Sequence, residues 1–217
     1  IKNLNVSYRK NVVLEGLSWT IKKGEQWLLT GASGSGKTTL AKVIAGLVQI
    51  SATIRINYSG TQASRTLYVA QWFPFKDKTG SSNFYYQQRY NSTEAEDCNT
   101  VWEELSAFCS KIHEDEARLI SLLKALALIH RKDAPLIQLS SGEHKKLQLT
   151  KALLLRPQLL ILDNPYTGLD VHTRGQLNRL VDEACAEGMQ LIMISNDGDY
   201  ASCISHYARL SEGKLTL

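Results

Sequence analysis

Apolar and polar residues change their spacing along this chain in a way that predicts alternating strands and helices. Segments 1–8 and 12–21 alternate as strands do and are joined by a short polar turn, which predicts an antiparallel pair. Continuous apolar runs at 26–30, 159–163 and 190–194 are typical of buried parallel strands. The pattern therefore predicts an α/β fold with a mostly parallel core sheet.

Other segments complete this pattern. Strand-like alternation and β-branching recur at 53–58 and 66–70. Between 100 and 129 the apolar spacing becomes helical and predicts a helical subdomain, with a stripe formed by Leu119, Leu122, Leu123, Leu126 and Ile129. A further helix is predicted over 171–186, and Gly188 is placed to end it, since glycine tolerates the left-handed conformation.

The segment 76–99 follows no period and is rich in Ser, Asn, Gln and Tyr. Its polarity favours a disordered linker. Its aromatic residues favour a packed surface insertion equally well; they are Phe84, Tyr85, Tyr86 and Tyr90. Both interpretations remain open from the sequence.

Composition limits the class of protein. With 217 residues, 43% of them hydrophobic and 21% charged, the chain can bury one sizeable core. A net charge of +4 does not nominate nucleic acid as a partner. No apolar run approaches the roughly 20 residues that cross a bilayer. The four cysteines form no C-x-x-C pair, so we expect buried free thiols in a cytosolic protein and not disulfides or a metal site. The chain opens at Ile1 inside a strand-like pattern, so we expect an excerpt of a longer polypeptide.

A glycine-rich loop lies between the apolar run 26–30 and the helix-like segment 40–45. It satisfies G-x-x-x-x-G-K-[ST] in a strand-to-helix context, and not the G-x-G-x-x-G of dinucleotide-binding folds. Glycines let backbone N–H groups converge on phosphate oxygens, while a lysine and a hydroxyl serve the β/γ phosphates and Mg²⁺. The sequence thus predicts a nucleoside triphosphate cradle formed by Gly31, Ser33, Gly34, Ser35, Gly36, Lys37, Thr38 and Thr39.

Polar residues stand where the other strands end. Gln71 follows the strand at 66–70, Asp163 ends the run 159–163, and Asn196 comes shortly after 190–194. Because the carboxyl ends of parallel strands meet at one edge of a sheet, we expect these side chains near Lys37.

These residues, together with Leu139–Glu143 and 167–170, make the chain resemble the nucleotide-binding domains of ABC ATPases over essentially all 217 residues. Leu139–Glu143 is similar to the LSGGQ signature, 159–163 to Walker B and 167–170 to the D-loop, while Gln71 matches the Q-loop glutamine. Tyr8 matches the aromatic that stacks on adenine, although a lone aromatic is often only packing.

This resemblance implies a P-loop NTPase fold of ABC type across residues 1–217. The mostly parallel core sheet would carry an N-terminal antiparallel β subdomain and a helical subdomain at about 72–155, with the polar insert at 76–99.

The resemblance also implies roles. The cofactors would be ATP and Mg²⁺, the metal being held by Thr38, Gln71 and Asp163. Two such domains clamp two ATP molecules head to tail, so that the signature residues serve the partner's ATP; they are Ser140, Ser141, Gly142 and Glu143. The implied partners are a second ABC domain, tandem or homodimeric, and a membrane transporter subunit at the inner face of the membrane.

The sequence departs from the family pattern at positions that act on the attacking water and at two positions of the signature. Asn164 stands where active members carry a glutamate after Walker B, and Asn196 replaces the switch histidine, with Asp197 the only adjacent acid. In the signature, Ser141 replaces a glycine and Glu143 a glutamine. An amide positions water but cannot take its proton. With Gln71, Asn164 and Asn196 as the catalytic positions, the sequence predicts Mg-ATP binding with slow hydrolysis.

Two finer interpretations remain. The signature, the D-loop, Asn196 and the polar insert resemble the N-terminal half of the tandem ModF-type ATP-binding proteins, which are associated with molybdate transport. The alternative to an ATPase domain of a transport machine is a non-transporting ABC regulatory module that uses ATP as a clamp ligand.

Overall fold

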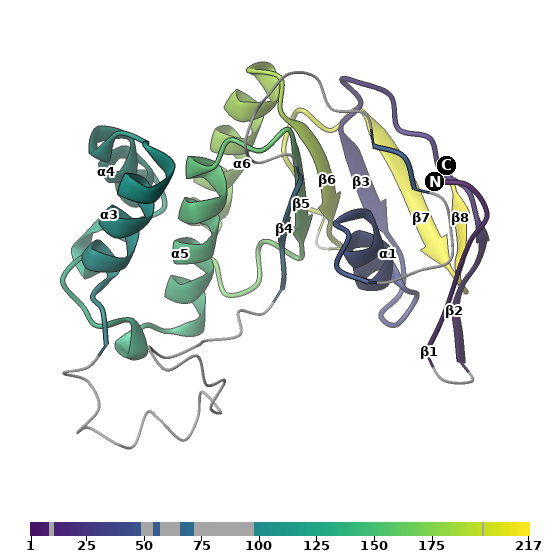
Figure 1. Ribbon diagram of the computed structural model, residues 1–217, viewed down its shortest axis with the longest axis horizontal. Coiled ribbons are helices and arrows are strands. Elements are labelled where there is room, and N and C mark those ends of the chain that lie inside the picture. Colours follow the sequence, from purple (N-terminus) through teal and green to yellow (C-terminus); the bar gives the residue numbers. More distant parts are fainter. Residues whose placement is uncertain (9–10, 49–53, 57–65, 72–97, 197) are drawn as a thin grey trace. The chain divides into compact units, whose positions relative to one another are not determined.

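Residues 1–8, 11–48, 54–56, 66–71, 98–196 and 198–217 are described by the computed structural model (Figure 1). The chain divides into two compact units. The first comprises Ile1–Gln71, Arg156–Pro165 and Asn178–Leu217, and the second Trp72–Leu155 and Tyr166–Leu177.

A six-stranded sheet of order β4-β5-β6-β3-β7-β8 forms the centre of the first unit. All neighbours pair in parallel except β7 and β8, which confirms the predicted α/β fold with a mostly parallel sheet. The strands are β3 (Trp27–Thr30), β4 (Thr66–Val69), β5 (Leu159–Asp163), β6 (Gln190–Ile194), β7 (His206–Ser211) and β8 (Lys214–Thr216).

A separate two-stranded sheet pairs β1 (Leu4–Tyr8) with β2 (Asn11–Leu17) in antiparallel fashion, as the sequence predicts. Both strands are shorter than the segments that alternate. Beyond the ladder, Ile1 and Trp19 still exchange two hydrogen bonds through their main chains, at 2.9 and 3.1 Å.

The core of this unit lies between the sheet and α1 (Lys37–Ile44), the helix that follows the glycine loop (Figure 1). Alternate residues of the strands, such as Ile161 and Ile192, pack with Leu40 and Ile44 of the helix. This packing fixes where α1 begins relative to the sheet.

The predicted strand at 53–58 is wrong where the structure describes it. Residues 54–56 have no strand conformation, because none of the described strands pairs with them. The remainder of that segment lies outside the described residues, as do 76–97 of the polar insert and Asp197.

The second unit contains the predicted helices, α3 (Val101–Ile112), α4 (Glu116–Ala125) and α5 (Ser141–Leu154), with short 3₁₀ turns at Ile129–Arg131 and Leu136–Gln138. Figure 1 shows α3 and α4 next to α5, in agreement with their contacts. Thr100 begins α3 with a reciprocal capping box.

The predicted stripe is right for Leu119, Leu122, Leu123 and Leu126, which are buried. The prediction is wrong for Ile129, the last member of the stripe. Because α4 ends at Ala125 and Ala127 takes a left-handed conformation with φ 49°, Leu128 is buried and Ile129 is only partly covered.

Helix α6 (Val171–Ala186) has the predicted bounds and ends at Gly188 as expected. Gly188 has φ 103°, its N–H donates to Cys185 O, and Met189 N–H donates to Ala184 O, both at 3.0 Å. This pair of bonds is a Schellman motif, which leads the chain directly into β6.

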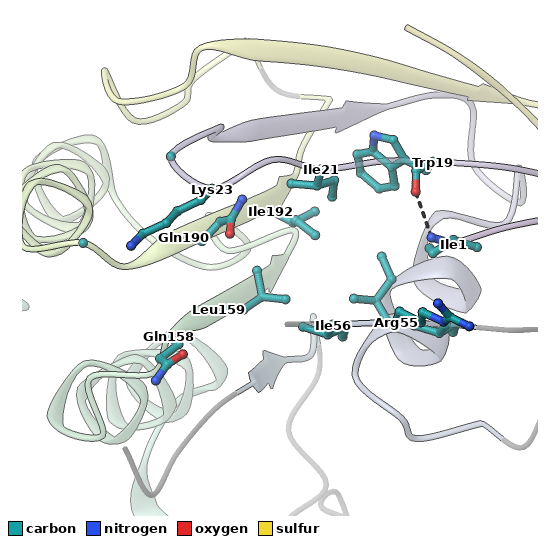
Figure 2. Close-up of a pocket in the computed structure, with 14 residues that line it drawn as sticks. Ile1, Trp19, Ile21, Lys23, Arg55, Ile56, Gln158, Leu159, Gln190 and Ile192 are labelled. Atoms are coloured by element: carbon teal, nitrogen blue, oxygen red, sulfur yellow. Dashed lines mark hydrogen bonds between the residues drawn. The ribbon is translucent and has the colours of Figure 1, made fainter. Parts of the chain in front are cut away.

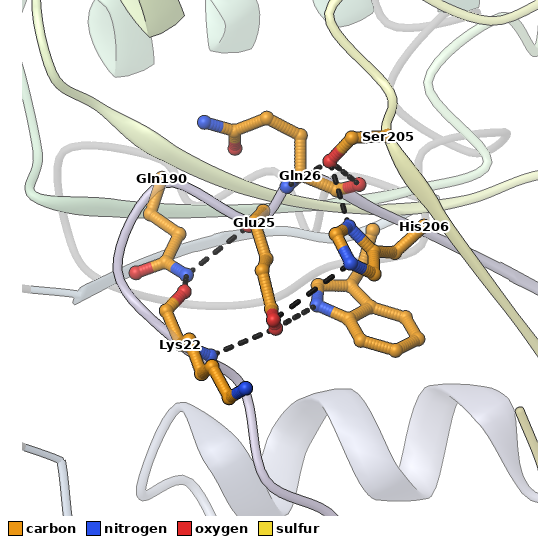
Figure 3. A network of polar contacts seen from close by, with 7 residues as sticks. Lys22, Glu25, Gln26, Gln190, Ser205 and His206 are labelled. Atoms are coloured by element: carbon orange, nitrogen blue, oxygen red, sulfur yellow. Dashed lines mark hydrogen bonds and ion pairs between the residues drawn. The ribbon is translucent and has the colours of Figure 1, made fainter.

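Polar contacts anchor the start of β3, the strand that leads to the glycine loop (Figure 3). Glu25 Oε2 accepts from the Lys22 N–H at 2.8 Å and from Trp27 Nε1 at 3.2 Å, and the Glu25 Oε1 lies 3.7 Å from His206 Nε2. The hydrogen bond from Lys22 is the main cause that holds the pKa of Glu25 below its ordinary value.

The four cysteines are free, as predicted, but only Cys109 is buried; Cys98, Cys185 and Cys203 are partly exposed. None of the described helices is both long and apolar enough to cross a membrane.

Candidate nucleotide-binding site

The glycine loop connects the carboxyl end of β3 to α1, and its geometry requires glycine at two positions. A Cβ at Gly31 would lie 2.1 Å from Leu210 O, and one at Gly36 would lie 2.9 Å from Leu14 Cδ2. Both residues have positive φ, 145° and 101°, which side chains rarely adopt. The backbone is therefore shaped by packing into a tight loop at a helix N-terminus, where anions bind favourably.

Lys37 lies inside this loop and is only 8% exposed. Its ammonium donates to Gly31 O and Ala32 O, both at 2.7 Å. Burial lowers the pKa of Lys37 from its ordinary value, and the nearby Asp163 carboxylate opposes that shift. A cation is thus held among backbone groups where a phosphate would be bound.

Asp163 is buried at the carboxyl end of β5 with 1% exposure. Its Oδ2 accepts from Thr38 Oγ1 at 2.7 Å and from Tyr68 Oη at 2.9 Å. Burial of Tyr68, reinforced by the facing carboxylate, raises the pKa of its phenol. A carboxylate and a hydroxyl next to a phosphate loop are hard oxygen donors, which suit Mg²⁺ bound with substrate phosphates.

Asn164 joins Gln71 to this carboxylate. Its Nδ2 donates to Gln71 Oε1 and to Asp163 Oδ1, both at 3.2 Å, and its N–H donates to Ile194 O at 2.9 Å. Asn164 has φ 45°, a left-handed conformation that asparagine tolerates better than most residues. The structure thus brings the predicted residues Gln71, Asp163 and Asn164 together.

Asn196 makes a contact that the sequence does not predict. Its amide pairs with the backbone of Gly31, donating to Gly31 O at 2.9 Å and accepting from Gly31 N–H at 3.2 Å. The residue in the switch position is therefore bound to the first glycine of the loop.

The signature residues lie in the second unit and begin α5. Ser140 and Glu143 form a reciprocal capping box, with Glu143 N–H 3.2 Å from Ser140 Oγ and Ser140 N–H 2.8 Å from Glu143 Oε2. Burial alone would raise the pKa of Glu143, but hydrogen bonds from Ser140 and the nearby Arg131 outweigh it and lower this pKa. Glu143 therefore stabilises the start of the helix.

Gly142 of the signature touches the turn at Gly168. A Cβ at Gly142 would lie 2.3 Å from Gly168 O, so the two backbones meet at a distance that only glycine permits. Ser141, next to Gly142, is the first residue of α5.

Tyr8 is the last residue of β1 and is 48% exposed. Its ring is accessible, as a stacking residue for adenine would need to be. Its predicted role remains a prediction.

A cavity of about 510 Å³ lies elsewhere in the first unit, at the amino ends of β5 and β6 (Figure 2). Leu159, Gln190 and Ile192 line it together with Trp19 and Ile21. Because ligands of parallel α/β sheets bind at the carboxyl ends of strands, the glycine loop is the stronger candidate site.

The strand, glycine loop, helix and buried aspartate define a P-loop nucleotide-binding domain. The family model described as ABC transporter matches residues 14–167, so the chain belongs to the ABC transporter family.

Curated relatives support this family. The energy-coupling factor transporter ATP-binding protein EcfA1 of Fusobacterium nucleatum is 30% identical over 99% of this chain and 79% of its own length. The zinc import ATP-binding protein ZnuC of a Wolbachia strain is 25% identical over 99% of the chain and 83% of its own length. The sulfate/thiosulfate import ATP-binding protein CysA of Escherichia coli is 31% identical over 82% of the chain.

The chain spans about half the length of some relatives: 47% of CysA and 45% of an uncharacterized ABC transporter ATP-binding protein of Schizosaccharomyces pombe. The latter is 27% identical over 100% of the chain.

A solved structure titled as an ATP-binding subunit of an ABC transporter superposes with a TM-score of 0.73 at 23% identity. It covers 100% of this chain and 87% of its own, and shows the same fold. These relatives are named for zinc, sulfate and energy-coupling factor transport, which does not support the expected link to molybdenum transport.

Proposed function

We propose that this chain is the ATP-binding domain of an ABC transporter-type protein, which binds Mg-ATP and hydrolyses it slowly. The observation that carries the proposal is the position of Lys37 and Thr38 at the start of α1. The ammonium lies 2.7 Å from two loop carbonyls, and the hydroxyl lies 2.7 Å from Asp163. Backbone, cation and oxygen donors for one Mg-nucleotide thus converge within the first unit.

Each residue has a distinct proposed role. Lys37 would bind the β/γ phosphates, and the N–H groups of the loop would bind phosphate oxygens. The Thr38 hydroxyl donates its proton to Asp163 Oδ2, which leaves its lone pairs free for the metal. Mg²⁺ held by these residues would neutralise charge that develops on the phosphates during transfer. Tyr8 is proposed to stack on the adenine and Gln71 to contact the metal and the water.

Slow hydrolysis follows from the amide of Asn164. A carboxylate in this position can orient water and accept its proton, and general-base assistance is worth typically about 10²–10⁴-fold. The Asn164 amide accepts no proton and its Nδ2 is directed to Gln71 and Asp163.

A second ABC domain completes the proposal. Ser140 to Glu143 stand at the N-terminus of α5, where backbone N–H groups and hydroxyls can bind an anion. We propose that they serve the ATP of a partner domain. We also propose that the pair works with a membrane subunit on the cytoplasmic side, since relatives are named as ATP-binding proteins of zinc import and of an energy-coupling factor transporter. The tandem ModF-type arrangement, supported only by the sequence motifs, remains a proposal.

A clamp function is the alternative that Asn164 itself favours. In a non-transporting regulatory module, ATP would hold two domains together and its hydrolysis would be incidental. Turnover separates the two proposals, because a transport motor must hydrolyse ATP and a clamp need not.

Pairing by ATP tests the proposed function. Light scattering of this chain, alone and with an ABC partner domain, should show ATP-dependent association under conditions that block hydrolysis. The matched control is Lys37→Ala in this chain, with the phosphate-loop lysine of the partner domain also replaced by alanine, and it should stay monomeric. If ATP changes the mass of neither mixture, the proposed clamp between signature and phosphate loop is wrong.

A further inference from the structure

Tyr68 contacts Asp163, one of the proposed ligands of Mg²⁺, although no sequence motif includes Tyr68. It lies on β4 and pairs with Ile161 of β5. Ile161 is two residues before Asp163 on the same strand, so the side chains of Ile161 and Asp163 share one face of the sheet. The ring of Tyr68 packs against the core between the sheet and α1. The ring is therefore held in place, and its hydroxyl extends along the sheet to Asp163 Oδ2 at 2.9 Å.

The hydroxyl of Tyr68 shares this oxygen with Thr38. Oδ2 accepts from Thr38 at 2.7 Å, while Oδ1 accepts from Asn164 at 3.2 Å. An aspartate carboxylate rotates readily about its last torsion, since that well is broad. Two hydroxyl donors from different elements on one oxygen oppose this rotation and fix the carboxylate plane.

This arrangement matters most for Thr38. The hydroxyl of Thr38 has one proton and two lone pairs, and an acceptor that holds the proton keeps the lone pairs directed away from Asp163, where a metal can use them. A carboxylate that turns away would remove the acceptor, so that the hydroxyl and the carboxylate would lose their orientation together. Tyr68 is anchored in the core and not in the loop, so it can hold Asp163 independently of the nucleotide.

We propose that Tyr68 is a positioning residue of the magnesium site, whose hydroxyl orients the Asp163 carboxylate, and through it the Thr38 hydroxyl, toward Mg²⁺. The inference rests on the proposed function, because it assumes that Mg-ATP binds in the cradle. Groups that orient metal ligands typically contribute about 10–100-fold to metal affinity.

The test is the ratio of two affinities. Calorimetry gives the affinity of the chain for ATP with excess Mg²⁺ and with EDTA, and their ratio measures the coupling between metal and nucleotide. In Tyr68→Phe, which keeps the ring and loses the hydroxyl, this ratio should fall about tenfold. The affinity in EDTA should be unchanged, because Lys37 and the loop N–H groups are intact.

Tyr207→Phe is the matched control. It removes a hydroxyl that contacts Tyr200 Oη at 3.3 Å on the exposed side of β7, and it should leave the ratio as in the parent. Tyr68→Met also lacks the hydroxyl but fills the space with a flexible apolar chain, so it should reproduce the result if Phe reduces stability.

The outcomes separate this inference from the proposed function. A parent chain that binds no ATP, or binds it equally with and without Mg²⁺, contradicts the proposed function. A parent with a large ratio that Tyr68→Phe and Tyr68→Met leave unchanged overturns the inference alone. A fall in the EDTA affinity equal to the fall with Mg²⁺ also overturns it, because Tyr68 would then serve only the fold.

Discussion

Asn164 Nδ2 donates to Gln71 Oε1 at 3.2 Å, although the two residues are 93 positions apart. The bond joins the residue after Walker B to the glutamine after β4. A glutamate in place of Asn164 has no proton to donate at neutral pH and would face the acceptor oxygens of Gln71 and Asp163. The residue at position 164 therefore decides both whether a general base is present and whether Gln71 keeps its hydrogen bond.

Asn164→Glu should raise the turnover of the chain assembled with the proposed second ABC domain, because a carboxylate accepts the proton of the attacking water. The double variant Asn164→Glu with Asn196→His should exceed either single one, since groups that act as a unit are not additive. Steady-state phosphate release at saturating Mg-ATP measures both. A parent rate of about 1 s⁻¹ or more that Asn164→Glu leaves unchanged contradicts the proposal that Asn164 limits hydrolysis.

The same substitution should reduce stability. Asn164 has φ 45°, and residues other than glycine, asparagine and aspartate lose about 1 kcal/mol in this left-handed region. Denaturant unfolding of Asn164→Glu should therefore show a free energy of unfolding about 1 kcal/mol lower than that of Asn164→Asp, which carries the same charge and loses the same amide protons but tolerates this conformation. An equally stable Glu variant would show that the backbone relaxes.

Gly142 offers a prediction with a matched control. A Cβ at Gly142 would lie 2.3 Å from Gly168 O, so Gly142→Ala should lower the free energy of unfolding by about 2 kcal/mol through overpacking. Gly175→Ala, in α6 with no atom within 4 Å of the new Cβ, should instead raise it by about 0.5–1 kcal/mol. Similar effects of the two variants would contradict the close approach of the signature and the D-loop turn.

Asp170 should contribute to stability in a pH-dependent way. Its carboxylate accepts from Thr173 N–H at 2.9 Å and from Thr173 Oγ1 at 2.7 Å, and these bonds lower its pKa from 3.8 to about 2. Because the folded-state pKa is lowered, the contribution is complete above about pH 4 and is lost as the pH falls toward about 2. The difference in melting temperature between parent and Asp170→Ala should shrink from pH 5 to pH 3, and a constant difference would contradict the assignment.

Short-range sequence signals predicted most of the fold. The apolar runs gave β5 and β6 with the observed bounds, and Gly188 marked the end of α6, because both signals depend on neighbouring residues. The strand at 54–56 was wrong because a strand requires a partner, which local alternation does not reveal.

The site was predictable where a motif carries it and not where distant residues meet. The loop residues follow from the spacing of the glycine motif, Asp163 from its place at the end of an apolar run, and Asn164 from the resemblance to ABC ATPases. The bond from Tyr68 to Asp163 joins residues 95 apart, and the Asn196–Gly31 pair joins residues 165 apart. No periodicity encodes these contacts, because they depend on strand order and on where α1 packs.

Calorimetric titration of Mg-ATP into the chain and its Lys37→Ala variant tests the central claim most directly. Lys37 Nζ is held 2.7 Å from Gly31 O and Ala32 O, and hydrogen bonds to charged groups contribute about 1.5–3 kcal/mol. We predict an affinity that falls about 10–100-fold in Lys37→Ala, while Lys42→Ala on the same helix binds like the parent. Equal affinities of the parent and Lys37→Ala would contradict the assignment of the glycine loop as the phosphate site.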